Sequence, residues 1–178
     1  MIGAVACLIA ATALVYSAGL PQRAAFTGRI IPGEVPIAPE LNARPPDFTA
    51  PTLAGDSLSL SDLRGQTVLI NFWATWCEPC RIEMPVLETL YQTYQATGLR
   101  VVAINLGESP AAAQRWADEF ELSFDLVLDP DNRIAPLYHL RGQPSTYVVS
   151  PDGLITQIFY GPAAEADLLA AFQPFLSS

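Results

Sequence analysis

The sequence predicts an α/β fold in which a central mixed β-sheet is flanked by helices, and three features of the chain support this. Apolar runs of strand length, such as residues 68–70 and 101–104, recur along the chain. Segments with helical spacing alternate with them, most clearly in residues 77–96. Residues 151–153 read Pro-Asp-Gly, a tight turn that joins two strand-like segments and so requires antiparallel pairing. This order of elements gives a mixed sheet with helices on both faces.

The elements of the domain follow from local patterns. Residues 47–60 alternate around an Ala-Gly-Asp turn and predict an N-terminal β-hairpin. Residues 67–73 are apolar except for Thr67 and Asn71 and predict a buried central strand. The helix in residues 77–96 is closed by Gly98 as a C-cap. The remaining predictions are a strand at 100–106, a helix from a Ser109-Pro110 cap to 121, a strand at 125–128, a helix at 132–140, strands at 146–150 and 154–160, and a final helix at 163–176.

Composition divides the chain into three segments. Residues 1–20 are predicted to be a transmembrane anchor or uncleaved signal, because residues 2–20 carry no charge and a helix of that length nearly crosses a hydrocarbon core about 30 Å thick. A cleaved secretory signal is the alternative. Residues 21–46 are rich in proline, which is typical of an extended linker. Residues 47–178 are expected to form one domain.

The charges of the chain bear on its partners and its orientation. With a net charge of -9 and no lysine, the chain has no basic stripe to neutralise phosphates, which argues against nucleic acid as a partner. Three arginines, Arg23, Arg29 and Arg44, follow the apolar segment. The positive-inside rule, applied to them alone, places the domain in the cytosol.

Of the three cysteines, two form a natural pair. Cys7 lies in the apolar N-terminal segment, whereas Cys77 and Cys80 are three residues apart. One pair is too few for a disulfide scaffold or for a four-ligand zinc site, and the single histidine, His139, adds at most a third ligand. We therefore expect no metal, and we assign His139 no catalytic role.

The position of the cysteine pair predicts redox chemistry. Cys77 falls where the strand at 67–73 meets the following helix, so unpaired backbone N–H groups and the helix dipole favour a thiolate there. The spacing brings Cys80 one turn away, within reach of a mixed disulfide on Cys77. Trp76, Glu78 and Pro79 make a polar, turn-like opening unlike core sequence. These features favour a redox-active pair over a structural one.

The motif Asn71-Phe72-Trp73-Ala74-Thr75-Trp76-Cys77-Glu78-Pro79-Cys80 resembles the extracytoplasmic thioredoxin-like proteins of the ResA, TlpA and CcmG group, and its Cys-Glu-Pro-Cys centre is closest to ResA. The resemblance extends from about residue 45 to the C-terminus. It implies a thioredoxin-like fold with a helix-strand insertion, and a membrane-anchored domain on the extracytoplasmic side, against the arginine argument. It also implies an oxidoreductase that reduces disulfides in partner proteins such as apocytochrome c during cytochrome c maturation. Its only cofactor would be the Cys77–Cys80 disulfide, recycled by a membrane thiol electron donor.

Further site residues rest partly on this resemblance. Glu83 follows Cys80 by three residues, and the resemblance assigns it proton transfer with that thiol. Thioredoxins often hold a buried aspartate where this chain has Asn71, which strengthens the assignment of Glu83. Pro144 is implied to be cis and to present backbone to a substrate strand beside the cysteines.

The expected substrate contacts surround the cysteine pair in the sequence and the proline loop. They are Trp76, Glu78, Pro79, Gln143 and Pro144.

Two other functions remain open from the residues alone. A peroxiredoxin-like peroxidase shares the hairpin and the insertion, but the chain lacks the Thr-x-x-Cys lead, since Thr75 is one residue too close to Cys77. A non-enzymatic copper-handling module would use Cys77, Cys80 and His139 as soft ligands.

Overall fold

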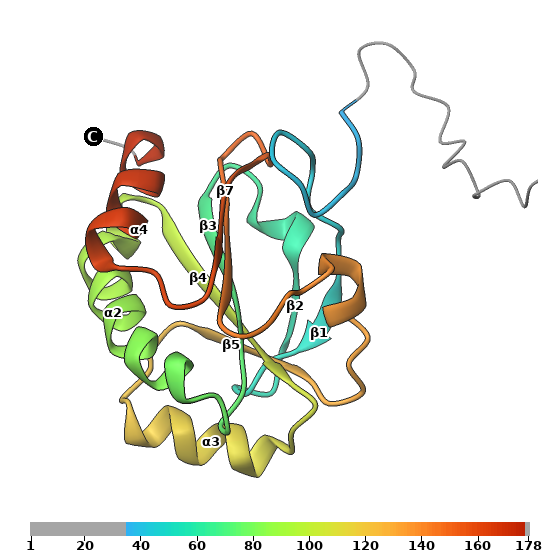
Figure 1. The fold of residues 1–178 in the computed structure, drawn as a ribbon, viewed down its shortest axis with the longest axis vertical. Coiled ribbons are helices and arrows are strands. Elements are labelled where there is room, and N and C mark those ends of the chain that lie inside the picture. Colours follow the sequence, from blue (N-terminus) through green and yellow to red (C-terminus); the bar gives the residue numbers. More distant parts are fainter. Residues whose placement is uncertain (1–34, 177–178) are drawn as a thin grey trace, which may run out of the picture. The chain divides into compact units, whose positions relative to one another are not determined.

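The computed structural model describes residues 35–176, and its central feature is a five-stranded sheet (Figure 1). The strand order is β5-β4-β3-β6-β7. Strands β3, β4 and β5 are parallel, whereas β6 pairs antiparallel with both β3 and β7, so the sheet is mixed as predicted. The elements are β1 (Thr49–Pro51), β2 (Ser57–Ser59), η1 (Leu60–Leu63), β3 (Thr67–Trp73), α2 (Glu78–Tyr94), η2 (Gln95–Thr97), β4 (Leu99–Leu106), α3 (Pro110–Glu119), β5 (Asp125–Asp129), η3 (Ala135–Tyr138), β6 (Ser145–Val149), β7 (Ile155–Tyr160), α4 (Glu165–Phe172) and η4 (Gln173–Phe175), where η denotes a 3-10 helix.

Strand β3 is the centre of the domain because both of its faces are buried. All seven of its residues are buried, and alternate side chains enter two separate apolar clusters. Leu69 and Trp73 pack with helix residues on one side, whereas Ile70 and Phe72 pack with the hairpin and the 3-10 helices on the other. This explains why the run at 68–73 is apolar at every position but Asn71.

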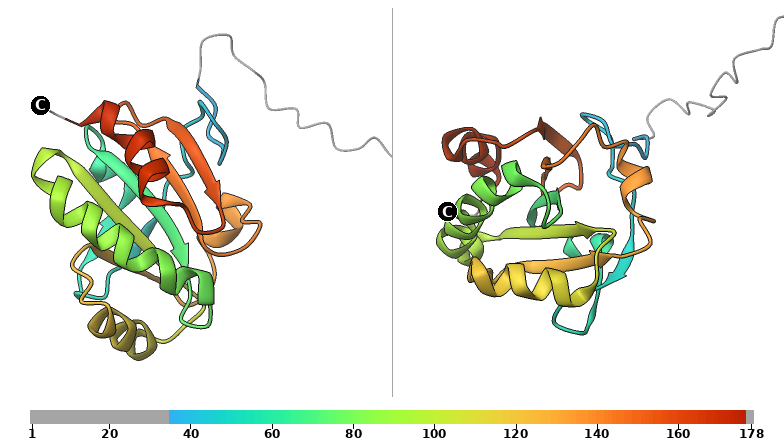
Figure 2. Two further views of the ribbon diagram at one scale, coloured as in Figure 1. Left: turned by 60° about the vertical axis from the view of Figure 1, so that its left-hand side comes forward. Right: turned by 60° about the horizontal axis from the view of Figure 1, so that its bottom comes forward.

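The three α-helices within residues 35–176 pack on one face of the sheet (Figure 2), which corrects the expectation of helices on both faces. Apolar residues of α2, α3 and α4 all belong to the same cluster. The opposite face is covered by η1, η3 and the β1–β2 hairpin. The segment predicted as a helix at 132–140 forms only the short η3.

The physical reason for the short η3 lies in the residues before it. Asn132 has a φ of 51°, a left-handed conformation that interrupts a helix. The carboxylate of Asp129 accepts hydrogen bonds from the backbone N–H groups of residues 133, 134 and 135 at 2.7, 2.9 and 3.1 Å. These donors are therefore satisfied without a preceding helical turn.

Other local signals are confirmed. Ser109 caps α3 through its side chain, with Pro110 at the first helical position. Gly98 adopts the left-handed φ of 99° expected of a C-cap, but it caps η2, because α2 ends at Tyr94 with Gln95 as its C-cap. The turn at 151–153 joins β6 and β7 as an antiparallel pair.

The first described residues pack against the sheet. Asn42 N–H donates to the carbonyl of Ile155 at 2.8 Å, and Ile155 N–H donates to the carbonyl of Ala43 at 2.9 Å. Tyr138 O–H donates to the carbonyl of Pro46 at 2.7 Å. The predicted anchor at 1–20 lies outside the described residues, and within 35–176 no helix has the length and apolar character to cross a membrane.

Candidate active site

Cys77 and Cys80 form a disulfide at the junction of β3 and α2. Cys77 is the N-cap of α2, and Pro79 lies in the first turn of the helix. The N–H of Cys80 donates to the Cys77 sulfur at 3.2 Å. The reason is local, because the apolar strand ends at Trp73 and proline stabilises the start of a helix. The prediction that the two sulfurs meet at a helix N-terminus is confirmed.

The two cysteines differ in exposure. Cys80 is fully buried, whereas Cys77 keeps 4% of its surface. Trp76, Glu78 and Pro79 are all exposed around it. In this oxidised form the protein therefore covers Cys80 completely, and Cys77 is the cysteine nearer to solvent. Any partner that approaches from solvent meets Cys77 first.

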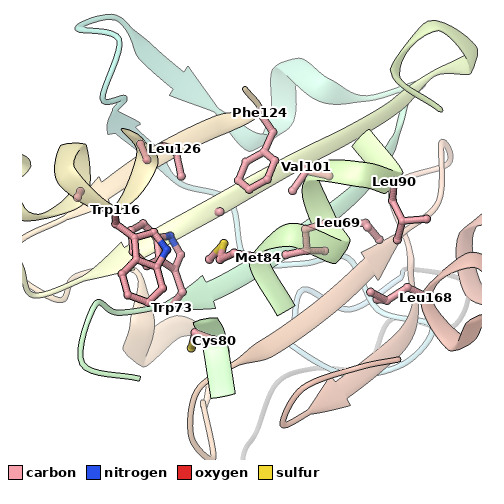
Figure 3. Close-up of a cluster of buried hydrophobic side chains, with 14 of the residues drawn as sticks. Leu69, Trp73, Cys80, Met84, Leu90, Val101, Trp116, Phe124, Leu126 and Leu168 are labelled. Atoms are coloured by element: carbon pink, nitrogen blue, oxygen red, sulfur yellow. The ribbon is translucent and has the colours of Figure 1, made fainter. Parts of the chain in front are cut away.

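An apolar cluster lies behind the disulfide (Figure 3). Trp73 and Trp116 stack with ring centroids 5.5 Å apart, next to Met84 and Cys80 in the same cluster. On the outer side, the guanidinium of Arg81 lies 5.0 Å from the centre of the Trp116 ring. This packing fixes the first turns of α2 and shows that Trp73 is a core residue.

Glu83 is a buried carboxylate one helical turn beyond Cys80 on α2. Only 1% of its surface is exposed. Its Oε2 accepts a hydrogen bond from Asn71 Nδ2 at 2.7 Å, and its Oε1 accepts one from the N–H of Ala163 at 2.9 Å. Burial raises the pKa of Glu83, while the hydrogen bonds from Ala163, Asn71 and Thr146 oppose that rise. A carboxyl group with a raised pKa is suited to exchange protons near neutral pH.

Asn71 connects Glu83 to strand β6. Its Nδ2 also donates to Thr146 Oγ1 at 2.8 Å, whereas its buried Oδ1 has no hydrogen-bond partner. The position that the resemblance associates with an aspartate thus holds a neutral amide bonded to Glu83.

The peptide bond between Gln143 and Pro144 is cis, as the resemblance implied. Pro144 directly precedes β6, whose Ser145 pairs with Phe72 of β3. The loop of Pro144 therefore lies at the same end of the sheet as the cysteine pair.

A groove of about 520 Å³ joins the cysteine motif to this proline loop. Trp76 and Gln143 both line it, together with Leu140 and His139. Trp76 is 69% exposed, so it faces solvent and the groove. Glu78 and Pro79 are exposed but do not line the groove.

The described residues offer no group of three or more His, Cys, Asp or Glu side chains placed to hold a metal ion. His139 lies in the groove with a left-handed φ of 47°.

No site role followed from the sequence for Thr75, which lies within the cysteine motif, or for Glu108, which binds it. Thr75 N–H donates to Glu108 Oε2 at 2.7 Å, and the Thr75 hydroxyl donates to Glu108 Oε1. The available signal was that Glu108 follows β4, the parallel neighbour of β3, so both residues lie at the carboxyl ends of adjacent strands.

A cysteine pair three residues apart, joined as a disulfide at the start of a helix in a thioredoxin-like fold, defines a thiol-disulfide oxidoreductase. The chain belongs to the AhpC/TSA family, which matches residues 41–158.

Curated relatives agree with this class. The chain is 36% identical over 123 residues to the thiol-disulfide oxidoreductase ResA of Geobacillus kaustophilus, covering 69% of this chain and 71% of the relative. It is 34% identical over 121 residues to ResA of Bacillus subtilis, covering 68% of each chain. A crystal structure of a Chlorobium tepidum protein assigned as thiol:disulfide interchange protein DsbE superposes with a TM-score of 0.67 at 30% identity, covering 72% of this chain and 95% of that one.

Proposed function

We propose that this oxidoreductase works as a reductase of disulfides in partner proteins, held at the cell membrane by an N-terminal anchor with its domain on the extracytoplasmic side. The observation that carries the proposal is a disulfide at the N-terminus of α2 with a buried carboxylate, Glu83, one turn further on. The uncharged segment at 2–20 supports the anchor. The family resemblance supports apocytochrome c, during cytochrome c maturation, as a substrate.

In the proposed mechanism the reduced Cys77 thiolate attacks one sulfur of a substrate disulfide. The substrate S–S bond breaks, one substrate sulfur leaves as a thiolate, and a mixed disulfide forms on Cys77. Glu83 accepts the proton of Cys80, and Cys80 then attacks the Cys77 sulfur. The second substrate sulfur leaves and takes up a proton, and the enzyme is left with the Cys77–Cys80 disulfide. A membrane dithiol donor returns two electrons to it and is itself oxidised.

The surroundings of the disulfide suit a protein substrate. Trp76 and Gln143 line one groove next to the cysteine motif, and Glu78 and Pro79 are exposed on the helix turn. A polypeptide that presents a disulfide to Cys77 meets these side chains at the same time. Trp76 offers it a large exposed aromatic surface.

Trapping of the mixed disulfide tests the mechanism. In a Cys7→Ala background, reduced C80A is mixed with a disulfide-linked peptide, and C77A is the matched variant. We expect a stable adduct on Cys77 in C80A and none in C77A, because only Cys77 is positioned to attack. An adduct on Cys80 in C77A, with none in C80A, would reverse the roles and sink the mechanism.

Four further measurements test the redox direction, the cellular role, the orientation and the class of reaction. The midpoint potential of the cysteine couple separates a reductant, near the thioredoxin value of about -270 mV, from an oxidant near about -120 mV. In cells that lack the chain, covalently bound haem c should fall, and the wild-type chain but not C77A should restore it. Protease treatment of intact cells or spheroplasts tests the orientation.

Peroxide consumption with a thiol donor at a rate above disulfide reduction would favour the peroxidase instead.

A further inference from the structure

Glu108 lies outside the cysteine motif, yet it binds the turn that leads into it. Its carboxylate accepts hydrogen bonds from the Thr75 N–H at 2.7 Å, from the Thr75 hydroxyl, and from Asn105 Nδ2 at 2.8 Å. Thr75 thus commits both its backbone donor and its side-chain donor to one carboxylate. The turn between β3 and α2 is thus fixed by a residue just beyond the end of the neighbouring strand β4.

Glu108 is itself held in place. Its neighbour Gly107 has φ 65°, and the Gly107 N–H donates to the carbonyl of Asp129 at 3.0 Å. The left-handed φ favours glycine at this position, and a Cβ atom there would lie 2.8 Å from Asn132 Nδ2 and push the Asn132 side chain aside. The carboxylate therefore projects from a backbone that is anchored to the end of β5.

The turn determines where the Cys77 sulfur lies. Cys77 N–H donates to the Ala74 carbonyl at 3.1 Å, which closes a tight turn with Thr75 inside it. The same Cys77 caps α2 through its sulfur. A change in the turn would carry this sulfur away from the N-terminal N–H groups of the helix.

We propose that Glu108 is a positioning residue for thiol-disulfide exchange, which acts through Thr75 to hold the turn of residues 74–77 and so keeps the reduced Cys77 sulfur at the N-terminus of α2. The helix N-terminus stabilises the thiolate, so the position of the sulfur governs its reactivity. This rests on Cys77 being the attacking cysteine, as proposed above. Failure of the trapping experiment would remove that premise, whereas the variants below test Glu108 and Thr75 with Cys77 intact.

The test compares Glu108→Ala, Glu108→Gln and Thr75→Val in the full-length protein, with Thr75→Ser and Glu119→Gln as matched controls. Thr75→Val removes the hydroxyl and alters no charge. Glu108→Gln removes the charge and keeps an oxygen that can accept from Thr75. With its oxygen in the place of Oε2, the glutamine still accepts from the Thr75 N–H and from Asn105 Nδ2, and its NH₂ group can donate to the Thr75 hydroxyl. Glu119 is an exposed carboxylate paired with Arg81, at 2.6 Å, and tests loss of charge near the site.

We measure kcat/KM for disulfide reduction, the pH profile of Cys77 alkylation in the reduced protein, and the melting temperature. Because hydrogen bonds to a charged group are among the stronger ones, kcat/KM should fall about ten- to a hundred-fold in Glu108→Ala and about three- to ten-fold in Thr75→Val. Glu108→Gln, Thr75→Ser and Glu119→Gln should stay within about three-fold of wild type. Thr75→Val should shift the alkylation profile to higher pH, since the thiolate loses its helix contact while every charge is kept.

A double-mutant cycle decides whether Glu108 acts through Thr75. The double variant Thr75→Val/Glu108→Ala should be no slower than Glu108→Ala alone, because the contact is already lost. Additive losses would overturn the proposal. So would a Glu108→Gln variant as slow as Glu108→Ala beside a Thr75→Val variant of wild-type rate, which would show that charge alone matters. A lower melting temperature with an unshifted alkylation profile would reduce the contact to a structural one and also overturn it.

Discussion

Replacing Glu83 with glutamine removes a buried charge from α2 while keeping the shape of the side chain. Glu83 is 1% exposed, so its carboxylate is almost fully desolvated when ionised. This burial raises its pKa, and the hydrogen bonds from Ala163 and Asn71 offset only part of the rise. The folded protein therefore holds the proton more tightly than the unfolded chain does.

The sign of the pH dependence follows from this difference. As the pH rises from 4.5, the ordinary pKa of the side chain, through the raised pKa of the folded state, the unfolded chain loses its proton first and the free energy of unfolding falls. Each unit of the rise in pKa corresponds to about 1.4 kcal/mol lost above that range. Below 4.5 the carboxyl group is protonated in both states, and this stability is fully retained.

Glutamine avoids the cost of burying a charge. Its carbonyl can still accept from the Ala163 N–H, and its NH₂ group can donate to Asn71 Oδ1 once the Asn71 amide turns over, which moves Asn71 Nδ2 away from residue 83. We expect Glu83→Gln to raise the free energy of unfolding near neutral pH by about 1–2 kcal/mol. Release of the substrate by Cys80 should slow by about a hundred-fold, because the proton acceptor is lost.

The assay is urea unfolding of the oxidised protein at several values between about pH 4 and pH 8. Glu165→Gln, which removes an exposed carboxylate from the first turn of α4, is the control and should leave the pH dependence as in wild type. The stability of Glu83→Gln should lose the fall with pH that the wild type shows. A variant that is less stable than wild type near neutral pH, or that keeps the same pH dependence, would refute the reasoning.

Three further predictions concern stability. Met84→Ala removes a fully buried side chain from the cluster behind the disulfide and should lower the free energy of unfolding by about 2–5 kcal/mol, measured by urea unfolding; a loss below about 1 kcal/mol would show that the core closes around the cavity. Asp129→Ala leaves the N–H groups of residues 133–135 without their acceptor, so the free energy of unfolding should fall by about 1–3 kcal/mol and hydrogen exchange in that segment should increase. Unchanged hydrogen exchange would show that Asp129 does not hold this segment. Tyr138→Phe removes the hydrogen bond to the Pro46 carbonyl and should lower the free energy of unfolding by about 1 kcal/mol. A melting temperature equal to that of wild type would show that water replaces the bond.

The reactive pair could be predicted from the sequence because its determinants are local. An apolar run fixes β3, and Pro79, two residues after Cys77, favours the start of α2, so the two cysteines meet within one helical turn. The β1–β2 hairpin and the antiparallel β6–β7 pair rest on short turns of the same local kind. Neither the cysteine pair nor these turns depend on contacts with distant parts of the chain.

Tertiary structure alone decided what surrounds the cysteines. Glu83 is buried because Asn71 and Ala163 approach from a strand and a loop that are 12 and 80 residues away, and no periodicity in the sequence encodes that meeting. Glu108 reaches Thr75 because β3 and β4 end at the same edge of the sheet, 33 residues apart in the chain. Sequence spacing determined which atoms react, and the sheet topology determined which carboxylates lie beside them.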